Sequence, residues 1–352
     1  MKKIEVNLPV KAYRVLVGTG VLDHLADELT HLQADGGVII ADRAVAEAHM
    51  SKLALSDAFK VLTVEPGEAS KSLDVAEELL NKMASLGITR DDVVITLGGG
   101  MVGDLGGFAA SIYMRGLRLF HVPTTVLSQV DSCIGGKTGV NLPLGKNLVG
   151  TFHQPAASFV DPSILTTLGD REYRSGFAEV LKYGWAFGDD TLASELDVSK
   201  VLARDPHILE EVIARCLGIK ADVVVRDEFD RLGHRALLNY GHTFGHALES
   251  AGSFALLHGE AVGLGMILAA ELSVELGMGP STLPDEHRNR ISSFGLPVEV
   301  ETDLDSIRGF LEIDKKANEG TKWVLLRDVG DPEIVSHVPD AALERAVGRL
   351  CP

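Results

Sequence analysis

Residues Val93–Gly107, VVITLGGGMVGDLGG, carry the clearest fold signal in the sequence. Its first five residues are mostly apolar and β-branched, which predicts a buried strand, and glycines follow at once before a helix-like segment. Gly98, Gly100 and Gly103 fit G-x-G-x-x-G, the pattern in which glycine lets backbone amides approach a pyrophosphate at a helix N-terminus. We therefore expect a phosphate-bearing nucleotide here; the alternative is a tight glycine turn without a ligand.

The glycine pattern departs from the usual dinucleotide fingerprint. It lies late in its region rather than in the first turn between a strand and a helix, and no acid stands about 20 residues further on. Asp42, at the end of an earlier strand, is the better candidate for binding a ribose hydroxyl. Expected strands are 38–41, 60–64, 93–97 and 117–122, with helices between them at 45–53 and 73–86.

Strands that alternate with helices predict a doubly wound parallel sheet, and the pattern changes near residue 160. We expect a Rossmann-like nucleotide-binding α/β domain at residues 1–160 and a mainly α-helical metal- and substrate-binding domain at 161–352. A short strand, 323–326, and a terminal helix from Asp340 end the chain. The expected helices of the second domain are 170–184, 206–225, 236–251, 259–277, 284–293 and 303–312.

Composition sets limits on partners and location. The 352 residues include 33 basic and 50 acidic ones, and the net charge of −17 argues against nucleic acid or an anionic membrane as the main partner. The beginning of the chain is too polar for a secretory signal, and the longest apolar run, 261–270, is too short to span a bilayer. Cys133, Cys216 and Cys351 form no C-x-x-C pair. These features favour a cytoplasmic protein.

Three histidines lie close together in apparently helical sequence. His242 and His246 are four residues apart, a spacing that puts two imidazoles on one helix face and suits a zinc-like ion, and His258 follows. The alternative is a pair of buried histidines bonded to nearby backbone. Asn239, Glu249 and Glu260 give the histidines polar neighbours, which favours a metal.

Two other segments carry candidate ligands. In FAEVLKYG, Glu179 and Lys182 share a helix face, either as an ion pair or as a metal-binding carboxylate beside a substrate-binding lysine. The region 121–147 reads as a long loop rich in glycine and polar residues, which is more often functional than structural. Its cluster of charged and amide side chains suits phosphate oxygens, although each lysine alone reads as a solvated surface charge. The cluster comprises Asp131, Lys137, Lys146 and Asn147.

Eight motifs, given in chain order at the end of this paragraph, make the sequence resemble the 3-dehydroquinate synthases over nearly the whole chain. The resemblance implies an enzyme of the shikimate pathway that needs NAD and a divalent metal, usually zinc, with cobalt also possible. It implies conversion of 3-deoxy-D-arabino-heptulosonate 7-phosphate, a sugar-acid phosphate, to 3-dehydroquinate and phosphate. The motifs are PGEASKS, LGGGMVGDLGGFAASIYMRG, VPTTVLSQVDSCIGGKTGVN, GKN, FAEVLKYG, LLNYGHTFGHALE, LHGEAVGLGM and DKKANEG.

The resemblance also assigns roles to residues, and it changes the role of His246 from metal chelation to the substrate side of the site. It implies Glu179, His242 and His258 as metal ligands, and a homodimer in which Arg115 reaches the partner's active site. Residues implied to border NAD are Asp42, Glu68, Lys71, Gly99, Gly100, Met101, Val102, Gly103, Asp104, Thr124, Thr125, Lys137, Lys146, Leu165, Thr166 and Thr167. The implied substrate pocket comprises Asp131, Lys137, Asn147, Lys182, Lys220, Arg235, Asn239, His246 and one of Lys315 and Lys316.

One stretch departs from the family pattern, and other activities share much of it. DEFDRLGHR, residues 227–235, is one residue longer than D-E-x-E-x-G-x-R, with Asp230 where glutamate is common, although Arg235 keeps its spacing to Asn239. Alternatives are other sugar phosphate cyclases, such as 2-deoxy-scyllo-inosose or valiolone synthases, a glycerol-type metal-dependent dehydrogenase, and a catalytically silent binding protein. Arg235, Asn239 and His246 together favour the dehydroquinate synthase.

Overall fold

The computed structural model describes residues 1–9, 11–251, 256–300 and 322–350. The chain forms two compact units: unit 1 is Met1–Leu168 with Pro206–Phe229, and unit 2 is Gly169–Asp205 with Asp230–Pro352. This division differs from a boundary at residue 160 chiefly by one long helix, α8 (Pro206–Arg226). Helix α8 belongs to unit 1 because it packs on strand β1 and on the π-helical turn η5 (Ser128–Ser132).

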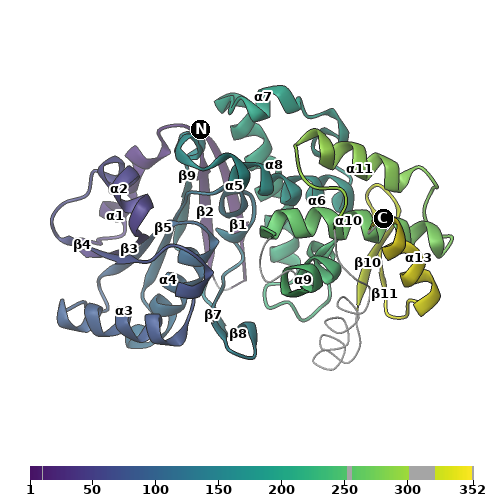
Figure 1. The fold of residues 1–352 in the computed structure, drawn as a ribbon. Helices are drawn as coiled ribbons and strands as arrows, with labels where there is room; N and C mark the ends of the chain where they lie inside the picture. The colour runs from purple at the N-terminus through teal and green to yellow at the C-terminus, as the bar shows by residue number, and fades with distance from the viewer. Residues whose placement is uncertain (10, 252–255, 301–321, 351–352) are drawn as a thin grey trace. The chain divides into compact units, whose positions relative to one another are not determined.

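Unit 1 is built on a seven-stranded sheet of order β1-β2-β9-β6-β5-β3-β4 (Figure 1). Neighbouring strands are parallel except in the β1–β2 hairpin, which is antiparallel. The expected α/β class and the four expected strands are confirmed, while β1, β2 and β9 were not expected. The strands are β1 Lys2–Asn7, β2 Ala12–Val17, β3 Gly37–Asp42, β4 Phe59–Val64, β5 Val93–Gly98, β6 Arg118–Pro123 and β9 Ala157–Val160.

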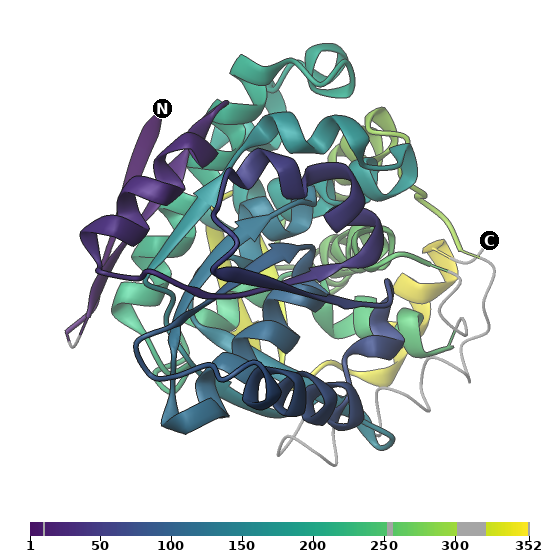
Figure 2. The ribbon, with the colours of Figure 1, turned by 90° about the vertical axis from the view of Figure 1, so that its left-hand side faces the viewer.

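Both faces of this sheet are buried, which explains why its central strands are mostly apolar. Ile39 and Ile95 join the core cluster that includes α1 (Leu25–His31), whereas Ile40 and Val94 join the cluster of α3 and α4. Each such side chain contributes roughly 1.5–3 kcal/mol by burial. The sheet separates α2 from α3 in Figure 2. The bounds of the remaining helices are α2 Arg43–His49, α3 Leu73–Ser85 and α4 Gly100–Ile112.

The region expected as a long loop contains regular structure. After β6 it forms the turn η5 and then an antiparallel hairpin of β7 (Lys137–Leu142) and β8 (Gly145–Phe152). Helix α4 packs on β7, so one face of the hairpin is covered. These strands contain many glycine and polar residues and few apolar ones. The sequence therefore lacks the apolar, β-branched run that usually indicates a strand.

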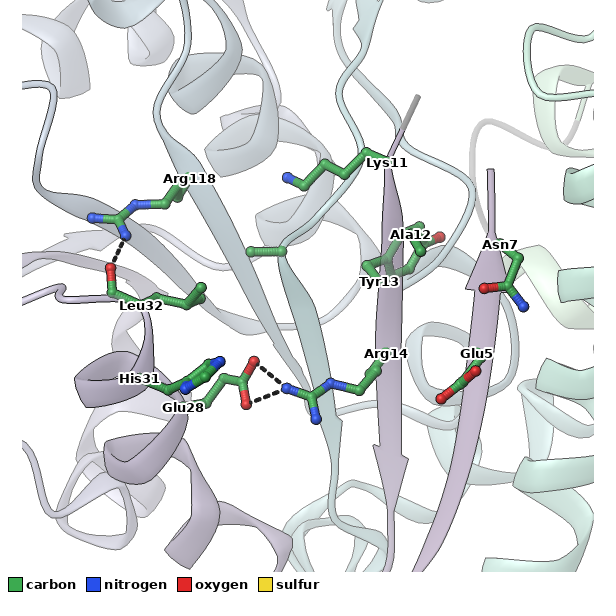
Figure 3. Close-up of a pocket in the computed structure, with 11 residues that line it drawn as sticks. Glu5, Asn7, Lys11, Ala12, Tyr13, Arg14, Glu28, His31, Leu32 and Arg118 are labelled. Carbon is green, nitrogen blue, oxygen red and sulfur yellow. Dashed lines mark hydrogen bonds and ion pairs between the residues drawn. The ribbon is translucent and has the colours of Figure 1, made fainter. Parts of the chain in front are cut away.

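A pocket of about 390 Å³ lies beside the β1–β2 hairpin (Figure 3). Arg14 on β2 donates two hydrogen bonds of 2.7 Å to Glu28 on α1, and Arg118 donates one to the carbonyl of Leu32. The Arg14 bonds attach the hairpin to α1, and the Arg118 bond attaches β6 to the residue that follows α1. Strands β5 and β6 are parallel. Arg118 is at the amino end of β6, whereas the glycine turn follows the carboxyl end of β5. The pocket and the glycine turn therefore lie at opposite ends of these strands.

Unit 2 is mainly helical, as expected, and its central helix is α10 (His258–Glu275), which is buried from Gly259 to Ser273. Helices α6, α9, α11 and α13 and strand β10 pack around α10 (Figure 1). The expected helix at 303–312 lies outside the described residues. None of the described helices is long and apolar enough to span a membrane. The other elements are α5 Asp170–Ser175, α6 Phe177–Phe187, α7 Val198–Leu202, α9 His242–Ala251, α11 Leu283–Ser293, β10 Trp323–Asp328, β11 Asp331–Val335 and α13 Asp340–Leu350.

Candidate active site

Close contact between two helices of unit 2 brings distant histidines together. Helix α9 begins at His242 and α10 begins at His258, and the two helices pack against each other. A Cβ on Gly265 of α10 would lie 1.9 Å from the carbonyl oxygen of Gly241, so only glycine permits this approach. The histidines at the two helix starts therefore face one site.

Glu179, from helix α6, completes a set of three side chains that could bind a metal. Its Oε1 atom lies 3.3 Å from Nε2 of His242 and 3.2 Å from Nε2 of His258. The three ligand atoms lie within 4.8 Å of one another. Tetrahedral zinc with bonds of about 2.0–2.1 Å separates its ligand atoms by about 3.3 Å. The spacing and the N,N,O chemistry of this triad therefore fit a divalent metal.

The second ring nitrogen of each histidine has an acceptor. Nδ1 of His242 lies 3.2 Å from the carbonyl oxygen of Tyr240, and Nδ1 of His258 lies 3.2 Å from Oε1 of Glu249. A proton on each Nδ1 would satisfy these acceptors and leave the Nε2 lone pair for a metal. Both rings are therefore oriented as ligands.

The electrostatics of the triad call for a cation. Glu179 and Lys182 are 1% and 2% exposed, and Lys182 forms an ion pair with the carboxylate. Burial alone would raise the pKa of Glu179, but Lys182 and His242 hold it well below its usual range. Burial alone would lower the pKa of His258, but its bonds to Glu179 and Glu249 raise it to about 9. A site that attracts a proton so strongly is suited to a metal ion.

His246 lies one helical turn after His242 and is exposed. The ring centroids of His242 and His246 are 5.4 Å apart. The described residues contain two groups of side chains that could hold a metal. One group is Glu179, His242 and His258, and the other is His246, Glu249 and His258. The four-residue spacing by itself thus does not identify the ligand set, because each histidine is grouped with side chains from elsewhere.

Several of the residues implied to bind NAD lie in or beside the glycine turn of unit 1. Gly99 precedes the first residue of α4, and the amide of Gly103 bonds to the carbonyl of Gly99 at 3.1 Å. The amide of Thr124 bonds to the carbonyl of Gly98 at 2.9 Å. Thr124 and Thr125 directly follow the end of β6. Amides of a first helical turn are suited to an anion, so this turn can hold a phosphate.

A buried lysine lies beside this turn. Nζ of Lys71 donates a 2.6 Å hydrogen bond to Asp104 on the first turns of α4, and it lies 3.8 Å from Glu68. Lys71 is 5% exposed and Asp104 is 25% exposed. Burial raises the pKa of Asp104 despite the opposing effect of Lys71. Asn141 donates a 2.7 Å hydrogen bond to Glu68, which ties the β7–β8 hairpin to this group.

Other residues implied to border NAD lie at the same edge of the sheet. Asp42 ends β3, whose neighbour is β5, and its carboxylate caps α2 by accepting a 2.8 Å bond from the amide of Val45. Leu165, Thr166 and Thr167 lie in the 3₁₀ helix η6 (Pro162–Thr167). Thr167 Oγ1 lies 2.7 Å from Nε2 of the buried His49.

Residues implied to bind substrate occur in both units. In unit 1, Nζ of Lys220 lies 3.0 Å from the carboxylate of Asp131 and donates a 2.8 Å bond to its carbonyl. Lys137 begins β7, while Lys146 and Asn147 lie in β8, where Asn147 has a left-handed φ of 57°.

In unit 2, Arg235 and Asn239 are the first and last residues of the 3₁₀ helix η8. Arg235 is 3% exposed, so its setting is not that of an exposed surface pair. Arg115, which belongs to unit 1, is exposed and has a φ of 70°. Lys315 and Lys316 lie outside the described residues.

Sequence reasoning gave no role to several residues at these sites. Glu249 was noted only as a polar neighbour, although it lies seven residues after His242 and therefore on the same helix face. The carbonyl of Tyr240 and the side chain of Asn141 had no sequence signal, because their contacts depend on tertiary packing.

Comparisons with known proteins agree over almost the whole chain. Models of the 3-dehydroquinate synthase N-terminal and C-terminal regions match residues 61–175 and 176–317. The chain is 41% identical to the 3-dehydroquinate synthase of Acidithiobacillus ferrooxidans, over 99% of this chain and 98% of that protein.

Solved structures of other sugar phosphate cyclases share the fold. A 2-deoxy-scyllo-inosose synthase complexed with carbaglucose-6-phosphate, NAD+ and Co2+ has a TM-score of 0.88 and 27% identity, covering 98% of this chain and 99% of that chain. A 2-epi-5-epi-valiolone synthase from Streptomyces hygroscopicus with NAD+ and Zn2+ bound has a TM-score of 0.88 and 28% identity, covering 98% of both chains. The higher identity and the matching family models show that the chain belongs to the 3-dehydroquinate synthase family, within the sugar phosphate cyclase superfamily.

Proposed function

We propose that this chain converts 3-deoxy-D-arabino-heptulosonate 7-phosphate into 3-dehydroquinate and phosphate, using NAD and one divalent metal ion, zinc or cobalt. The observation that carries the proposal is the Glu179–His242–His258 triad, whose buried carboxylate pairs with Lys182, in a chain of this family. When bound, the metal would polarise a substrate hydroxyl, and NAD would accept a hydride and later return it. The overall conversion is therefore redox-neutral.

The chain's own residues bind and orient the reactants. In unit 1, the amides that follow Gly99 and the Lys71 ammonium offer positive charge to the phosphates of NAD. In unit 2, Lys182 and the exposed His246 are donors near the triad that suit phosphate or hydroxyl oxygens. A fixed array of such donors lowers the barrier of each step by holding one geometry.

Arg235 distinguishes this reaction from those of related cyclases. A guanidinium grips a planar carboxylate with two parallel bonds, which lysine cannot reproduce. The heptulosonate phosphate has a carboxylate, whereas glucose 6-phosphate and sedoheptulose 7-phosphate have none. We expect Arg235→Lys to lower kcat/KM for the heptulosonate phosphate about 10- to 100-fold while NAD and metal binding stay intact. Near-normal efficiency in this variant would contradict the assignment.

The direct test of the function is an assay of phosphate release from the heptulosonate phosphate, with and without a metal chelator. We expect release that requires NAD, stops with the chelator and returns when Zn2+ or Co2+ is added. NADH absorbance should not increase in proportion to product, because the hydride is returned. An increase in that proportion would indicate a dehydrogenase. Faster release from glucose 6-phosphate or sedoheptulose 7-phosphate would indicate one of the other cyclases.

We also propose that the protein is a cytoplasmic homodimer in which Arg115 lies near the partner's active site. In support, Arg115 is exposed beside two exposed apolar side chains, Ile112 at 41% and Met114 at 44%. Cys133 and Cys216 are buried free thiols, as in proteins of reducing compartments. Sedimentation analysis tests the dimer, and mixing Arg115→Ala with His258→Ala tests whether activity recovers in mixed dimers. A monomer, or no recovery from a dimer, would contradict the proposal.

A further inference from the structure

The two histidine ligands of the triad are supported by groups of different charge. Nδ1 of His242 faces a neutral backbone carbonyl, that of Tyr240, at 3.2 Å. Nδ1 of His258 faces the Glu249 carboxylate, also at 3.2 Å. Both acceptors select the same ring tautomer, but only Glu249 adds a negative charge. The two ligands are therefore not equivalent.

Glu249 is buried on the helix that carries His242. It is 6% exposed and lies on α9, the helix that begins with His242. Seven residues separate His242 from Glu249, which puts both on one face of the helix. Helix α9 thus provides one ligand directly and supports the second ligand, on α10, through Glu249.

The backbone at His258 is held independently of Glu249. A Cβ on the next residue, Gly259, would lie 1.8 Å from the carbonyl oxygen of Ser175, so α10 begins in direct contact with α5. The amide of Gly259 bonds to Oγ of Ser175 at 3.1 Å, and Glu260 accepts a 2.8 Å bond from the amide of Leu257. With the backbone fixed, the orientation of the imidazole depends on what its far nitrogen contacts.

We propose that Glu249 is a positioning residue that sets the tautomer and orientation of His258 and strengthens its binding to the metal. This inference rests on the proposed function. A carboxylate that accepts a hydrogen bond from Nδ1–H increases electron density at Nε2, and loss of such a partner typically weakens metal binding about 10- to 100-fold. In this arrangement Glu249 acts on the metal through His258.

The test measures metal affinity alone, without substrate. Purified apoprotein is titrated with Zn2+ in competition with a chromophoric chelator, and with Co2+ while its visible spectrum is recorded. We expect Glu249→Gln to weaken Zn2+ binding about 10- to 100-fold and to alter the Co2+ spectrum, and Glu249→Ala to weaken binding at least as much. The glutamine variant keeps the side-chain shape and an acceptor oxygen, so it remains informative if the alanine variant fails to fold.

A matched control lies on α10. Glu271 is also buried, at 3% exposure, but bonds to Arg288 at 2.6 Å and Arg349 at 2.7 Å. Glu271→Gln should leave Zn2+ affinity unchanged even where it lowers thermal stability. Weakened Zn2+ binding in this control equal to that of Glu249→Gln would show a general packing effect and overturn the proposal.

Other outcomes separate this inference from the proposed function. If the unmodified protein binds Zn2+ and folded Glu249→Gln binds it equally well, Glu249 has no positioning role, while the metal site stands. If the unmodified protein binds no Zn2+, the metal site itself is wrong. If His246→Ala loses as much affinity as His242→Ala, Glu249 acts as a direct ligand together with His246, and the positioning role is rejected.

Discussion

In each unit a buried lysine pairs with a carboxylate, yet the pKa values of the two carboxylates shift in opposite directions. In unit 1, Lys71 bonds to Asp104 at 2.6 Å, and burial raises the pKa of Asp104. In unit 2, Lys182 pairs with Glu179, whose pKa is held well below its usual range although burial alone would raise it. The difference lies in the other neighbours: Asp104 also has the acidic Glu68 nearby, whereas Glu179 has His242 and His258.

This comparison shows that one lysine does not by itself determine the charge of a buried carboxylate. Desolvation opposes ionisation of a carboxyl group, a nearby cation favours it, and a second acid opposes it. Glu179, with a lysine and two imidazoles, remains a carboxylate and is suited to bind a metal. Asp104 is easier to protonate and is suited to orienting Lys71 beside the glycine turn.

Removal of the Glu179 carboxylate should have the largest effect. In Glu179→Ala, Lys182 loses its buried partner, which costs about 3–5 kcal/mol in the free energy of unfolding. The metal should also be lost, and with it several kcal/mol of transition-state stabilisation, or on the order of a 10³-fold loss of turnover. Metal analysis, urea denaturation and phosphate release measure these effects. Asp104→Ala should keep its metal, and full metal occupancy in Glu179→Ala would refute the ligand assignment.

Each unit contains a buried histidine whose pKa is lowered by burial. We therefore expect acid to lower the free energy of unfolding. Burial lowers the pKa of His121 in unit 1 from 6.5 to about 4, and that of His287 in unit 2 from 6.5 to about 3. Because the folded values lie below the unfolded value, the unfolded chain binds more protons between them. The free energy of unfolding should therefore fall as pH falls from 6.5 towards 4 and 3, by up to roughly 3 kcal/mol for His121 and roughly 5 kcal/mol for His287.

Urea denaturation between pH 7 and pH 4 measures this loss. His121→Gln should give a flatter profile, because its side chain can still bond to Thr96 and does not take up a proton; the His121–Thr96 distance is 2.7 Å. The exposed His24 provides the control, since His24→Gln should leave the profile as it is. An unchanged slope in His121→Gln would show that this histidine does not contribute.

Neutralisation of Asp104 should have a smaller effect than loss of Glu179. The pKa of Asp104 is raised in the folded protein, so its contribution to stability is present at low pH and lost as pH rises through that value. Asp104→Asn should therefore change the free energy of unfolding at pH 7 by less than about 1 kcal/mol. Weaker orientation of Lys71 should reduce NAD affinity about tenfold, measured by calorimetry. A stability loss above about 2 kcal/mol would mean that the ionised pair stabilises the fold.

The strands were predictable where both faces are buried. Val93–Leu97 is apolar because it lies between two helical layers, so the strand appears directly in the sequence. The hairpin of β7 and β8 was not predictable, because its glycine and polar residues resemble those of a loop. The β1–β2 hairpin was missed for a related reason, since β1 buries little of its surface.

The residues alone offered Glu179 and three histidines as candidate metal ligands, and only the resemblance favoured His242 and His258 over His246. Helical spacing relates residues within one helix, and it therefore suggested His242 with His246. The observed group combines the starts of α9 and α10 with a residue of α6, and their approach depends on Gly265, whose position in a helix gives no hint of a site. The role of Glu249 depends on the same tertiary contact.

The smallest expected effect comes from an exposed counterpart of the buried pair. Glu78 and Lys82 on α3 are four residues apart, with charged atoms at 3.5 Å and side-chain exposures of 69% and 50%. Water and salt screen this pair, and holding two long side chains costs conformational entropy. Glu78→Gln should thus lower the free energy of unfolding by less than about 0.5 kcal/mol, and less still at high salt. Urea denaturation at low and high ionic strength measures it. If this variant destabilised the protein as much as Glu179→Ala, burial would not be what separates the two lysine–glutamate pairs.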